Sequence, residues 1–564
     1  MTFKPALFEQ RFVLDHIVGL SGIDADAAEL ADAVLEGAGD FAAGTWAPLD
    51  RLGDVEGPRW TAAGVTMPAG FADAYQAYVD GGWGTIGSPV EFGGQGLPVS
   101  LSVAVLETLG TANMGFALAP ILTAGAVEAL LHHGSAAQQN AYLPHLCTGA
   151  WTGTMNLTEP QAGSDVGAVR TKADPVGDGR FRIKGTKIFI SFGDHDMASN
   201  IVHLVLARTP GAPAGTRGLS LFLVPKYRLE SDGRPGAAND IRTVSIEHKM
   251  GLHASPTCVL SFGDNDDCIG ELIGDEGGGI RAMFTMMNNA RLNVGLQGVQ
   301  VAERATQRAI LYASERMQGA RAGAQTAIVE HPDVRRMLLR MKAQTQAARA
   351  LVYYAFGQLD RAQAGDAMAG RRVDLLTPLA KAHATDLGNE VASLGLQVHG
   401  GMGFIEETGA AQHFRDARIT PIYEGTNGIQ AADLVGRKLG MDDGATLFAV
   451  LADMRAESDH GELLRLIDSC ERVARHLLAS SPDDRLAASY PFLTMVSVAV
   501  AGWLMERSGT IAAAGGGDPT FLRMKQSCAR FYLEQIVAEA AGLAAAAMAP
   551  AAALYEIDAE TLAA

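Results

Sequence analysis

The segment IYEGTNGIQ, residues 422–430, places a single carboxylate, Glu424, among uncharged residues and glycines. Water is a good ligand of an ionised carboxylate, so a dry setting raises the pKa of Glu424. Such a base is matched to removing a weakly acidic C–H proton near neutral pH. The same residues also fit a helix N-terminus, in which Thr426 or Asn427 caps the helix and Glu424 complements its dipole. The segment alone leaves both interpretations open.

A second segment, LTEPQAGSDVGAVRTKA at 157–173, has the composition of a ligand-facing loop. It mixes hydroxyls, a proline and small residues without apolar periodicity. Thr158, Ser164 and nearby backbone amides can hydrogen-bond a phosphate or the edge of a polar ring, and Gly163 allows a close approach to the backbone. Taken alone, the run favours a simple Asx or Ser turn.

A third segment, GTKIFIS at 185–191, ends a predicted strand with an aromatic residue and a hydroxyl. Phe189 can cover one face of a flat heterocycle, and Ser191 can donate a hydrogen bond to it. A half-buried strand without a ligand is the commoner meaning of such a run.

Two glycines and two arginines are weaker candidates. The glycines in QVHGGMGF, 397–404, fit a helix C-terminus and can also admit a dinucleotide backbone. Arg291 and Arg316 can each fork onto a phosphate, although an arginine on a helix is more often a solvated surface group. No GxGxxG follows a strand and opens a helix, so a Rossmann nucleotide site is not supported.

Length, charge and cysteine usage limit the classes of protein that must position these residues. At 564 residues the chain predicts several domains, and a formal net charge of −18 without a dense Lys/Arg run argues against nucleic-acid binding. Five scattered cysteines without a CxxC pair fit reduced thiols in a cytosolic protein and leave no readable zinc site. We see no secretory signal and predict no membrane span, hence a cytoplasmic protein.

Hydrophobic patterning divides the chain into four predicted parts. Helical periodicity covers the first part, short β-rich runs the second, and helical periodicity returns in the third and fourth. In the third part, apolar residues recur every three or four positions from Leu376 to Val398, which predicts a long buried helix. His383 lies on that apolar face, and we assign it a structural role. The predicted boundaries are an N-terminal helical domain at 1–152, a central β domain at 153–274, a helical bundle at 275–440 and an appended helical domain at 441–564.

Finer predictions concern particular runs of the central part. Strands are expected at 181–190, 201–207, 219–224 and 257–262. The polar, Gly/Pro-containing segment at 228–240 is expected to be a surface loop between two of them.

Taken in order, these motifs resemble those of the acyl-CoA dehydrogenase family over about residues 70–440. The matching runs are GGWGTIGSPVEFGGQGLP (81–98), LTEPQAGSD (157–165), GTKIFIS (185–191), HKMGLHASPT (248–257), QVHGGMGF (397–404) and RDARITPIYEGTNGIQ (415–430). The opening residues 5–14, the FIS and GDHD runs and the C-terminal helical part are most similar to the long bacterial subfamily. That subfamily includes 3-methylmercaptopropionyl-CoA dehydrogenases and broad-chain acyl-CoA dehydrogenases.

The resemblance implies an α+β multidomain fold with a helical domain, a central β-barrel-like domain, a four-helix domain that carries the catalytic glutamate, and the extra C-terminal helical domain. It implies FAD as cofactor and Glu424 as catalytic base. The residues implied to contact FAD are Leu157, Thr158, Gly163, Ser164, Phe189, Ile190, Ser191, Arg316, Gln397, Gly400, Gly401 and Thr426. Those implied to contact substrate are Ser164, Arg291 and Gly425.

Three details of the resemblance affect these assignments. The family usually has Trp-Ile-Thr where this chain has Phe189, Ile190 and Ser191, a change that keeps an aromatic ring and a hydroxyl. Arg316, Gln397, Gly400 and Gly401 match positions that reach the FAD of a neighbouring subunit, so a homodimer or homotetramer is expected. A glutamine of the family is replaced around residues 331–332, and its adenosine contact is not carried over.

The implied reaction is α,β-dehydrogenation of an acyl-CoA thioester to a trans-2-enoyl-CoA, with electrons passed to an electron-transfer flavoprotein. Glu424 takes the α-proton and flavin N5 accepts the β-hydride. The acyl group is left open between 3-methylmercaptopropionyl and medium or long chains. The alternatives are an acyl-CoA oxidase and a non-catalytic, flavin-containing DNA-binding homologue of the same fold.

Overall fold

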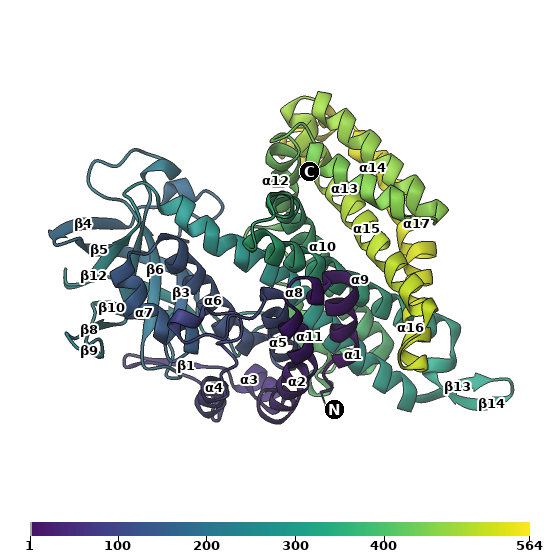
Figure 1. The fold of residues 1–564 in the computed structure, drawn as a ribbon, viewed down its shortest axis with the longest axis horizontal. Helices are drawn as coiled ribbons and strands as arrows, with labels where there is room; N and C mark the ends of the chain where they lie inside the picture. The colour runs from purple at the N-terminus through teal and green to yellow at the C-terminus, as the bar shows by residue number, and fades with distance from the viewer. Residues whose placement is uncertain (1–2) are drawn as a thin grey trace. The chain divides into compact units, whose positions relative to one another are not determined.

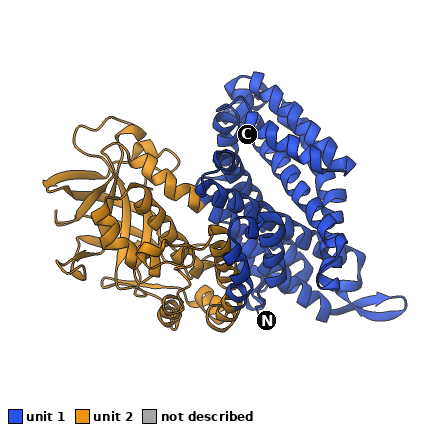
Figure 2. Cartoon of the chain, viewed as in Figure 1, with its two compact units in different colours: residues 1–36, 291–564 blue, residues 37–290 orange. Residues whose placement is uncertain are grey.

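The computed structural model describes residues 3–564, which form two compact units (Figure 2). One unit comprises residues 37–290, and the other comprises residues 3–36 together with 291–564. The helices α2 (Ala25–Phe41) and α8 (Gly279–Glu315) contain the points where the chain passes from one unit to the other. The sequence-based boundaries between four domains stay a prediction.

The unit of residues 37–290 combines helices with a mixed eight-stranded sheet (Figure 1). Its helices are α3 (Ala47–Glu56), α4 (Phe71–Asp80), α5 (Val99–Ala112), α6 (Met114–His133) and α7 (Ala136–Thr148). The sheet contains β3 (Thr152–Asn156), β4 (Lys172–Gly177), β5 (Arg180–Ser191), β6 (Ile201–Ala207), β7 (Ser220–Pro225), β10 (Ile241–Ile246), β11 (Thr257–Phe262) and β12 (Ile269–Ile273). The four predicted strands of the central part are confirmed as β5, β6, β7 and β11.

The sheet has the order β10-β11-β5-β12-β7-β6-β3, and β4 pairs with β5. All pairs are antiparallel except β3 with β6. Because side chains alternate along a strand, the apolar run of β6 buries Leu204 against the helix-covered face and Val205 against the other. Helix α6 packs on β3, which places the loop after β3 at the edge of a rigid layer.

Two short hairpins of this unit depart from the sequence-based prediction. The strands β8 (Tyr227–Leu229) and β9 (Pro235–Ala238) form a hairpin in the segment 228–240, which was expected to be a surface loop, and β8 begins one residue before it. The strands β1 (Arg59–Thr61) and β2 (Gly64–Thr66) interrupt the part expected to be helical. Pairs of three or four residues carry too little hydrophobic alternation to be recognised in a sequence.

The second unit is a helical bundle. Its helices before residue 440 are α1 (Leu7–Val13), the second half of α8, α9 (Pro332–Gln363), α10 (Ala367–His399), α11 (Ala410–Ala417) and α12 (Asn427–Asp433), with a hairpin of β13 (Met317–Arg321) and β14 (Ala324–Ala327). Helix α10 confirms the predicted long buried helix. The side chain of His383 is buried and lies 3.5 Å from the hydroxyl of Tyr532, in keeping with a structural role.

The appended helices belong to the same compact unit as the bundle. They are α13 (Ala445–Glu457), α14 (Gly461–Ala479), α15 (Pro482–Ala514), α16 (Pro519–Phe531), α17 (Val537–Ala541) and α18 (Ala559–Leu562). Helix α15 packs against α9, α10 and α12, as its course in Figure 1 illustrates. The C-terminal part is therefore integrated with the bundle that carries Glu424.

Two helices in the described residues are long and apolar enough to cross a membrane, α6 and α15. In both, 83% of the apolar window is buried inside the fold, which is typical of core helices. All five cysteines are free and buried.

Candidate active site

The segment around Glu424 is a tight connection between α11 and α12. The backbone N–H of Asn427 donates to the carbonyl of Pro421 (2.9 Å), and the hydroxyl of Thr426 accepts from the N–H of Ile429 (3.1 Å). Thr426 is thus the N-cap of α12, as one of the two interpretations of the segment predicted. The cap uses the hydroxyl of Thr426 and not the carboxylate of Glu424.

The backbone of Glu424 is held in an unusual conformation. Its φ is +55°, and the next residue, Gly425, has a φ of +82°. A side chain in the left-handed region costs about 1–3 kcal/mol, and such residues cluster at functional sites. A Cβ on Gly425 would lie 2.8 Å from the side-chain nitrogen of Gln430, which would have to shift, and the positive φ itself favours glycine. The fold therefore maintains a strained turn to present Glu424.

The electrostatic surroundings of Glu424 combine burial with two cations. Burial raises the pKa of its carboxyl above the ordinary value, and the charges of Arg291 and Lys381 act in the opposite direction. Arg291 is itself buried, and its Nη2 lies 3.7 Å from the position of a Cβ on Gly425. Arg291, Gly425 and Glu424, all predicted from the sequence, are thus brought together in this unit.

In the unit of residues 37–290, the predicted flavin-contacting loop lies between β3 and β4. The loop is tied to strand β5, because the N–H of Ile188 donates to the carbonyl of Thr158 (2.9 Å). The predicted residues Leu157 and Thr158 are therefore brought beside the predicted end of β5. Ser164 and Gly163 are exposed in the same loop, and a Cβ on Gly163 would meet open space.

The end of β5 presents an aromatic side chain in a strained conformation. Phe189 has a φ of +61° and is 60% exposed, whereas its neighbours Ile188 and Ile190 are half-buried and buried. Ile190 is buried and Ser191 is half-buried. An exposed ring at a strained backbone position is the arrangement expected of a surface that covers a flat ligand.

Sequence reasoning missed two residues that hold this loop, Glu159 and Lys187. The ammonium of Lys187 donates to Glu159 (2.9 Å) and to the carbonyl of Leu157 (3.0 Å), and Glu159 also accepts from the hydroxyl of Thr171 (2.5 Å). Although burial opposes ionisation, Lys187 and these donors hold the pKa of Glu159 at about 2. The sequence does contain one indication that Lys187 is buried. Because side chains alternate along a strand, Lys187 falls on the same face as the apolar residues Phe181 and Ile183.

Four predicted residues lie on the surface of the single chain. Arg316 joins α8 to β13, Gln397 lies near the end of α10, and Gly400 and Gly401 follow that helix; all four are exposed. Gly400 has a φ of +59°, in agreement with a helix stop. Their predicted role toward the FAD of a neighbouring subunit stays a prediction.

Four family models match consecutive parts of the chain. They describe the N-terminal domain of acyl-CoA dehydrogenases (residues 33–150), the middle domain (154–265), the C-terminal domain (277–439) and an acetyl-CoA dehydrogenase C-terminal-like domain (446–558). The chain therefore belongs to the acyl-CoA dehydrogenase family. The predicted family, enzyme class and fold class are confirmed.

Individual relatives show which members of the family the chain resembles. A 3-methylmercaptopropionyl-CoA dehydrogenase of Ruegeria pomeroyi is 45% identical and aligns over 96% of this chain and 97% of its own. The broad-specificity linear acyl-CoA dehydrogenase FadE5 of Mycobacterium tuberculosis is 33% identical over 84% of both chains. An acyl-CoA dehydrogenase of Bacillus anthracis, solved with FAD, has a similar fold, with a TM-score of 0.76, 22% identity and coverage of 100% of this chain and 94% of its own.

Proposed function

We propose that the chain catalyses α,β-dehydrogenation of an acyl-CoA thioester to a trans-2-enoyl-CoA, with Glu424 as the base that removes the α-proton. The observation that carries the proposal is the strained turn that presents a carboxylate of raised pKa beside Arg291. A base tuned upward is suited to a weakly acidic C–H proton. The cap of α12 is made by the hydroxyl of Thr426, so the carboxylate of Glu424 takes no part in the capping hydrogen bond.

FAD is the cofactor of the family, and the residues present fit it. The exposed ring of Phe189 can cover one face of the flavin, and the hydroxyls of Thr158 and Ser164 can donate to its polar edge or to the pyrophosphate. The open space beside Gly163 admits the ligand near the backbone. When bound, FAD supplies the acceptor for the hydride that leaves the β-carbon.

The protein's own part of the reaction is to move one proton and to stabilise the charge that results. Glu424 takes the α-proton while Arg291 and Lys381 favour its ionised form beforehand. A thioester α-proton requires that the carbonyl oxygen be stabilised as charge develops. Within residues 3–564, the backbone N–H of Glu424 has no hydrogen-bond partner, and we assign it as a donor to that oxygen.

The relatives guide the choice of substrate and partner. The 45% identity to a 3-methylmercaptopropionyl-CoA dehydrogenase favours a short thioether acyl group, with medium and long chains as competitors. We further propose that an electron-transfer flavoprotein accepts the electrons, that the enzyme is a cytoplasmic homodimer or homotetramer, and that Arg316, Gln397, Gly400 and Gly401 complete the neighbouring subunit's FAD site.

Anaerobic bleaching of the purified holoenzyme tests the reaction. We expect the flavin absorbance to fall on addition of 3-methylmercaptopropionyl-CoA and to fall more slowly with butyryl-, octanoyl- and palmitoyl-CoA. Bleaching by a longer acyl-CoA in preference would keep the reaction and change the substrate. If none of the four acyl-CoA thioesters reduces the flavin, the proposed function is wrong.

An acyl-CoA oxidase differs only in its electron acceptor. Hydrogen peroxide formed at the rate of substrate oxidation, without an added carrier, would identify one. The alternative of a non-catalytic DNA-binding protein is disfavoured by the net charge of −18. A salt-sensitive mobility shift with duplex DNA would support that alternative.

The buried pair of Lys187 and Glu159 gives a prediction about FAD binding. Lys187→Met removes the ammonium that holds the carbonyl of Leu157 and leaves Glu159 buried with a weaker set of donors. We expect FAD to bind about tenfold more weakly or worse, a cost of ~1.4 kcal/mol or more, as measured by flavin fluorescence titration of the apoprotein.

The matched control is Lys184→Met on the same strand. Lys184 is 57% exposed and pairs with Asp266 at the surface, so its loss should leave FAD affinity unchanged. Equal affinities of the two variants would contradict a role of Lys187 in shaping the loop.

A further inference from the structure

The appended helices reach the base segment through a chain of four polar side chains. The hydroxyl of Tyr490 on α15 donates to Asp386 Oδ2 on α10 (2.7 Å). Asp386 Oδ1 accepts from Asn427 Nδ2 at the start of α12 (2.8 Å), and Asn427 Oδ1 accepts from Lys381 Nζ on α10 (2.8 Å). The chain begins on the appended helix α15 and ends at Lys381, whose charge acts on the carboxylate of Glu424.

Asn427 fixes the base segment to α10 with both ends of its amide. Besides its bond to Asp386, Nδ2 donates to the carbonyl of Ala382 (3.1 Å) and to Thr385 (3.0 Å). Asn427 is buried, lies three residues after Glu424, and its own N–H closes the turn. Since Thr426 already caps the helix, these bonds serve a purpose other than helix initiation.

Lys381 is an unusual residue for the interior of a helix bundle. It is 0% exposed, and in the part of the chain that the structure describes its ammonium has one hydrogen-bond partner, the neutral amide of Asn427. A lysine is rarely buried without a carboxylate partner at hydrogen-bond distance. Burial lowers its pKa to about 7, while the charges of Glu424 and Asp386 oppose that shift.

The charges that act on this group come from several helices. On Glu424 they are Arg291 of α8 and Lys381 of α10. Asp386 faces Lys381 and Arg418 as well as the hydroxyl of Tyr490, and Arg291 faces Asp433 and Arg437. Glu424 therefore has two cations that act on its carboxylate, and Lys381 is connected to the appended helices through Asn427, Asp386 and Tyr490.

We infer that Tyr490, Asp386, Asn427 and Lys381 form a positioning relay, through which the appended helices hold the base segment and keep Glu424 ionised for proton removal. The inference rests on the proposed function of Glu424. Within this relay Lys381 acts on Glu424 by its charge, and Tyr490 acts by orienting Asp386. The appended helices then contribute to the chemistry as well as to the stability of the bundle.

The relay predicts the direction in which the pH dependence of flavin reduction shifts when one of its residues is replaced. The base must be ionised, so the rate of flavin reduction is lost as pH falls through the pKa of Glu424. Lys381→Met removes a cation, which raises that pKa and moves the acidic limb to higher pH by about one unit. Tyr490→Phe removes a donor that stabilises the ionised Asp386. The carboxylate of Asp386 is then ionised to a smaller extent and stabilises the Lys381 cation less. The acidic limb of the rate profile should therefore also move to higher pH, by a smaller amount than in Lys381→Met.

The experiment compares wild type, Lys381→Met, Tyr490→Phe and a control, Tyr532→Phe. Tyr532 is a tyrosine of the appended part whose hydroxyl also faces α10, at His383, but outside the relay. The pH dependence of flavin reduction is measured by stopped flow. The titration of the Glu424 carboxyl is followed independently by infrared difference spectra, assigned with Glu424→Gln.

Upward shifts in Lys381→Met and Tyr490→Phe, a lowered kcat with little change in KM, and a wild-type profile for Tyr532→Phe support the relay. Folded Tyr490→Phe protein with the wild-type profile and wild-type carboxyl titration would overturn it, even if Lys381→Met fails to fold. If wild type is not bleached by any acyl-CoA, the proposed function fails, and the infrared titration still decides whether Lys381 and Tyr490 set the ionisation of Glu424.

Discussion

Glu424→Gln is expected to retain FAD and to lose at least about 10³ of the rate of acyl-CoA-dependent flavin bleaching. The amide preserves the volume and polarity of the side chain but cannot accept the α-proton, and a positioned general base contributes roughly 10²–10⁴ in rate. The backbone N–H that we assign to the thioester carbonyl is unchanged by the substitution. Acyl-CoA should therefore still bind, as detected by a shift of the flavin spectrum without its bleaching.

Glu534→Gln is the matched control, because Glu534 is exposed on the appended helices and far along the chain from the base segment. It should bleach at the wild-type rate. Bleaching of Glu424→Gln at that same rate would exclude Glu424 as the base. Loss of FAD from the variant, measured by its absorbance ratio, would instead show that the carboxylate supports the fold of the site.

The helix start beside Glu424 could be predicted from the sequence because its information is local. A carboxylate between apolar and glycine residues, followed by a hydroxyl in cap position, is contained in a few consecutive residues, and the structure shows Thr426 in that position. The positive φ of Glu424 could not be predicted in this way, since left-handed backbone is ordinarily reserved for glycine. The surrounding fold imposes this conformation.

The residues that we propose to act on Glu424 were missed because their partners are distant in the sequence. Lys381 and Asn427 are 46 residues apart, and Tyr490 and Asp386 are 104 apart. In the sequence Lys381 is a lysine within a helical pattern, which ordinarily indicates a solvated position. Only the packing of α15 against α10 and α12 reveals that this side of the helix is closed.

Long elements were predicted better than short ones for a related reason. Helix α10 and strand β5 bury side chains at regular intervals and β6 is a continuous apolar run, whereas β8 and β9 have only three and four residues. The grouping of residues 3–36 with the C-terminal helices could not be predicted from the sequence either, because nothing in the sequence of α1 indicates which helix it packs against.

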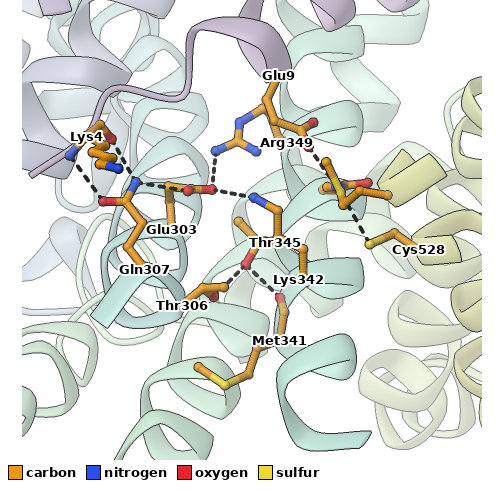
Figure 3. Close-up of polar contacts among 12 residues, drawn as sticks. Lys4, Glu9, Glu303, Thr306, Gln307, Met341, Lys342, Thr345, Arg349 and Cys528 are labelled. Carbon is orange, nitrogen blue, oxygen red and sulfur yellow. Dashed lines mark hydrogen bonds and ion pairs between the residues drawn. The ribbon is translucent and has the colours of Figure 1, made fainter. Parts of the chain in front are cut away.

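A buried network of charges connects the segments of this unit, and Figure 3 shows its part around Glu303, Lys342 and Arg349. Glu303 of α8 accepts from Arg349 of α9 at 2.9 Å, and Lys342 lies 3.8 Å away. Glu9 of α1 pairs with Lys525 of α16 at 3.1 Å. These side chains are buried or nearly so, and a charge left without its partner in such a place is costly. The network links the N-terminal helix, the bundle and the appended helices.

Arg349→Met should accordingly destabilise the helical unit by roughly 3–5 kcal/mol, because it leaves the carboxylate of Glu303 buried with a weakened set of cations. Urea unfolding followed by helical circular dichroism measures the change in the free energy of unfolding. Arg336→Met provides the control, because Arg336 lies on the same helix in an exposed pair with Asp333 and should change stability little.

The same pair makes the unit sensitive to acid. Burial alone would raise the pKa of Glu303, but Lys342 and Arg349 hold it at about 2, below the ordinary carboxyl value of 4.5. The unfolded chain then binds more protons between these values, so this contribution to stability is complete above about pH 4.5 and is lost as pH falls toward 2. Arg349→Met should reduce the dependence of the free energy of unfolding on pH between about 2 and 4.5. An acid unfolding profile with the wild-type pH dependence would show that Arg349 does not hold Glu303 ionised.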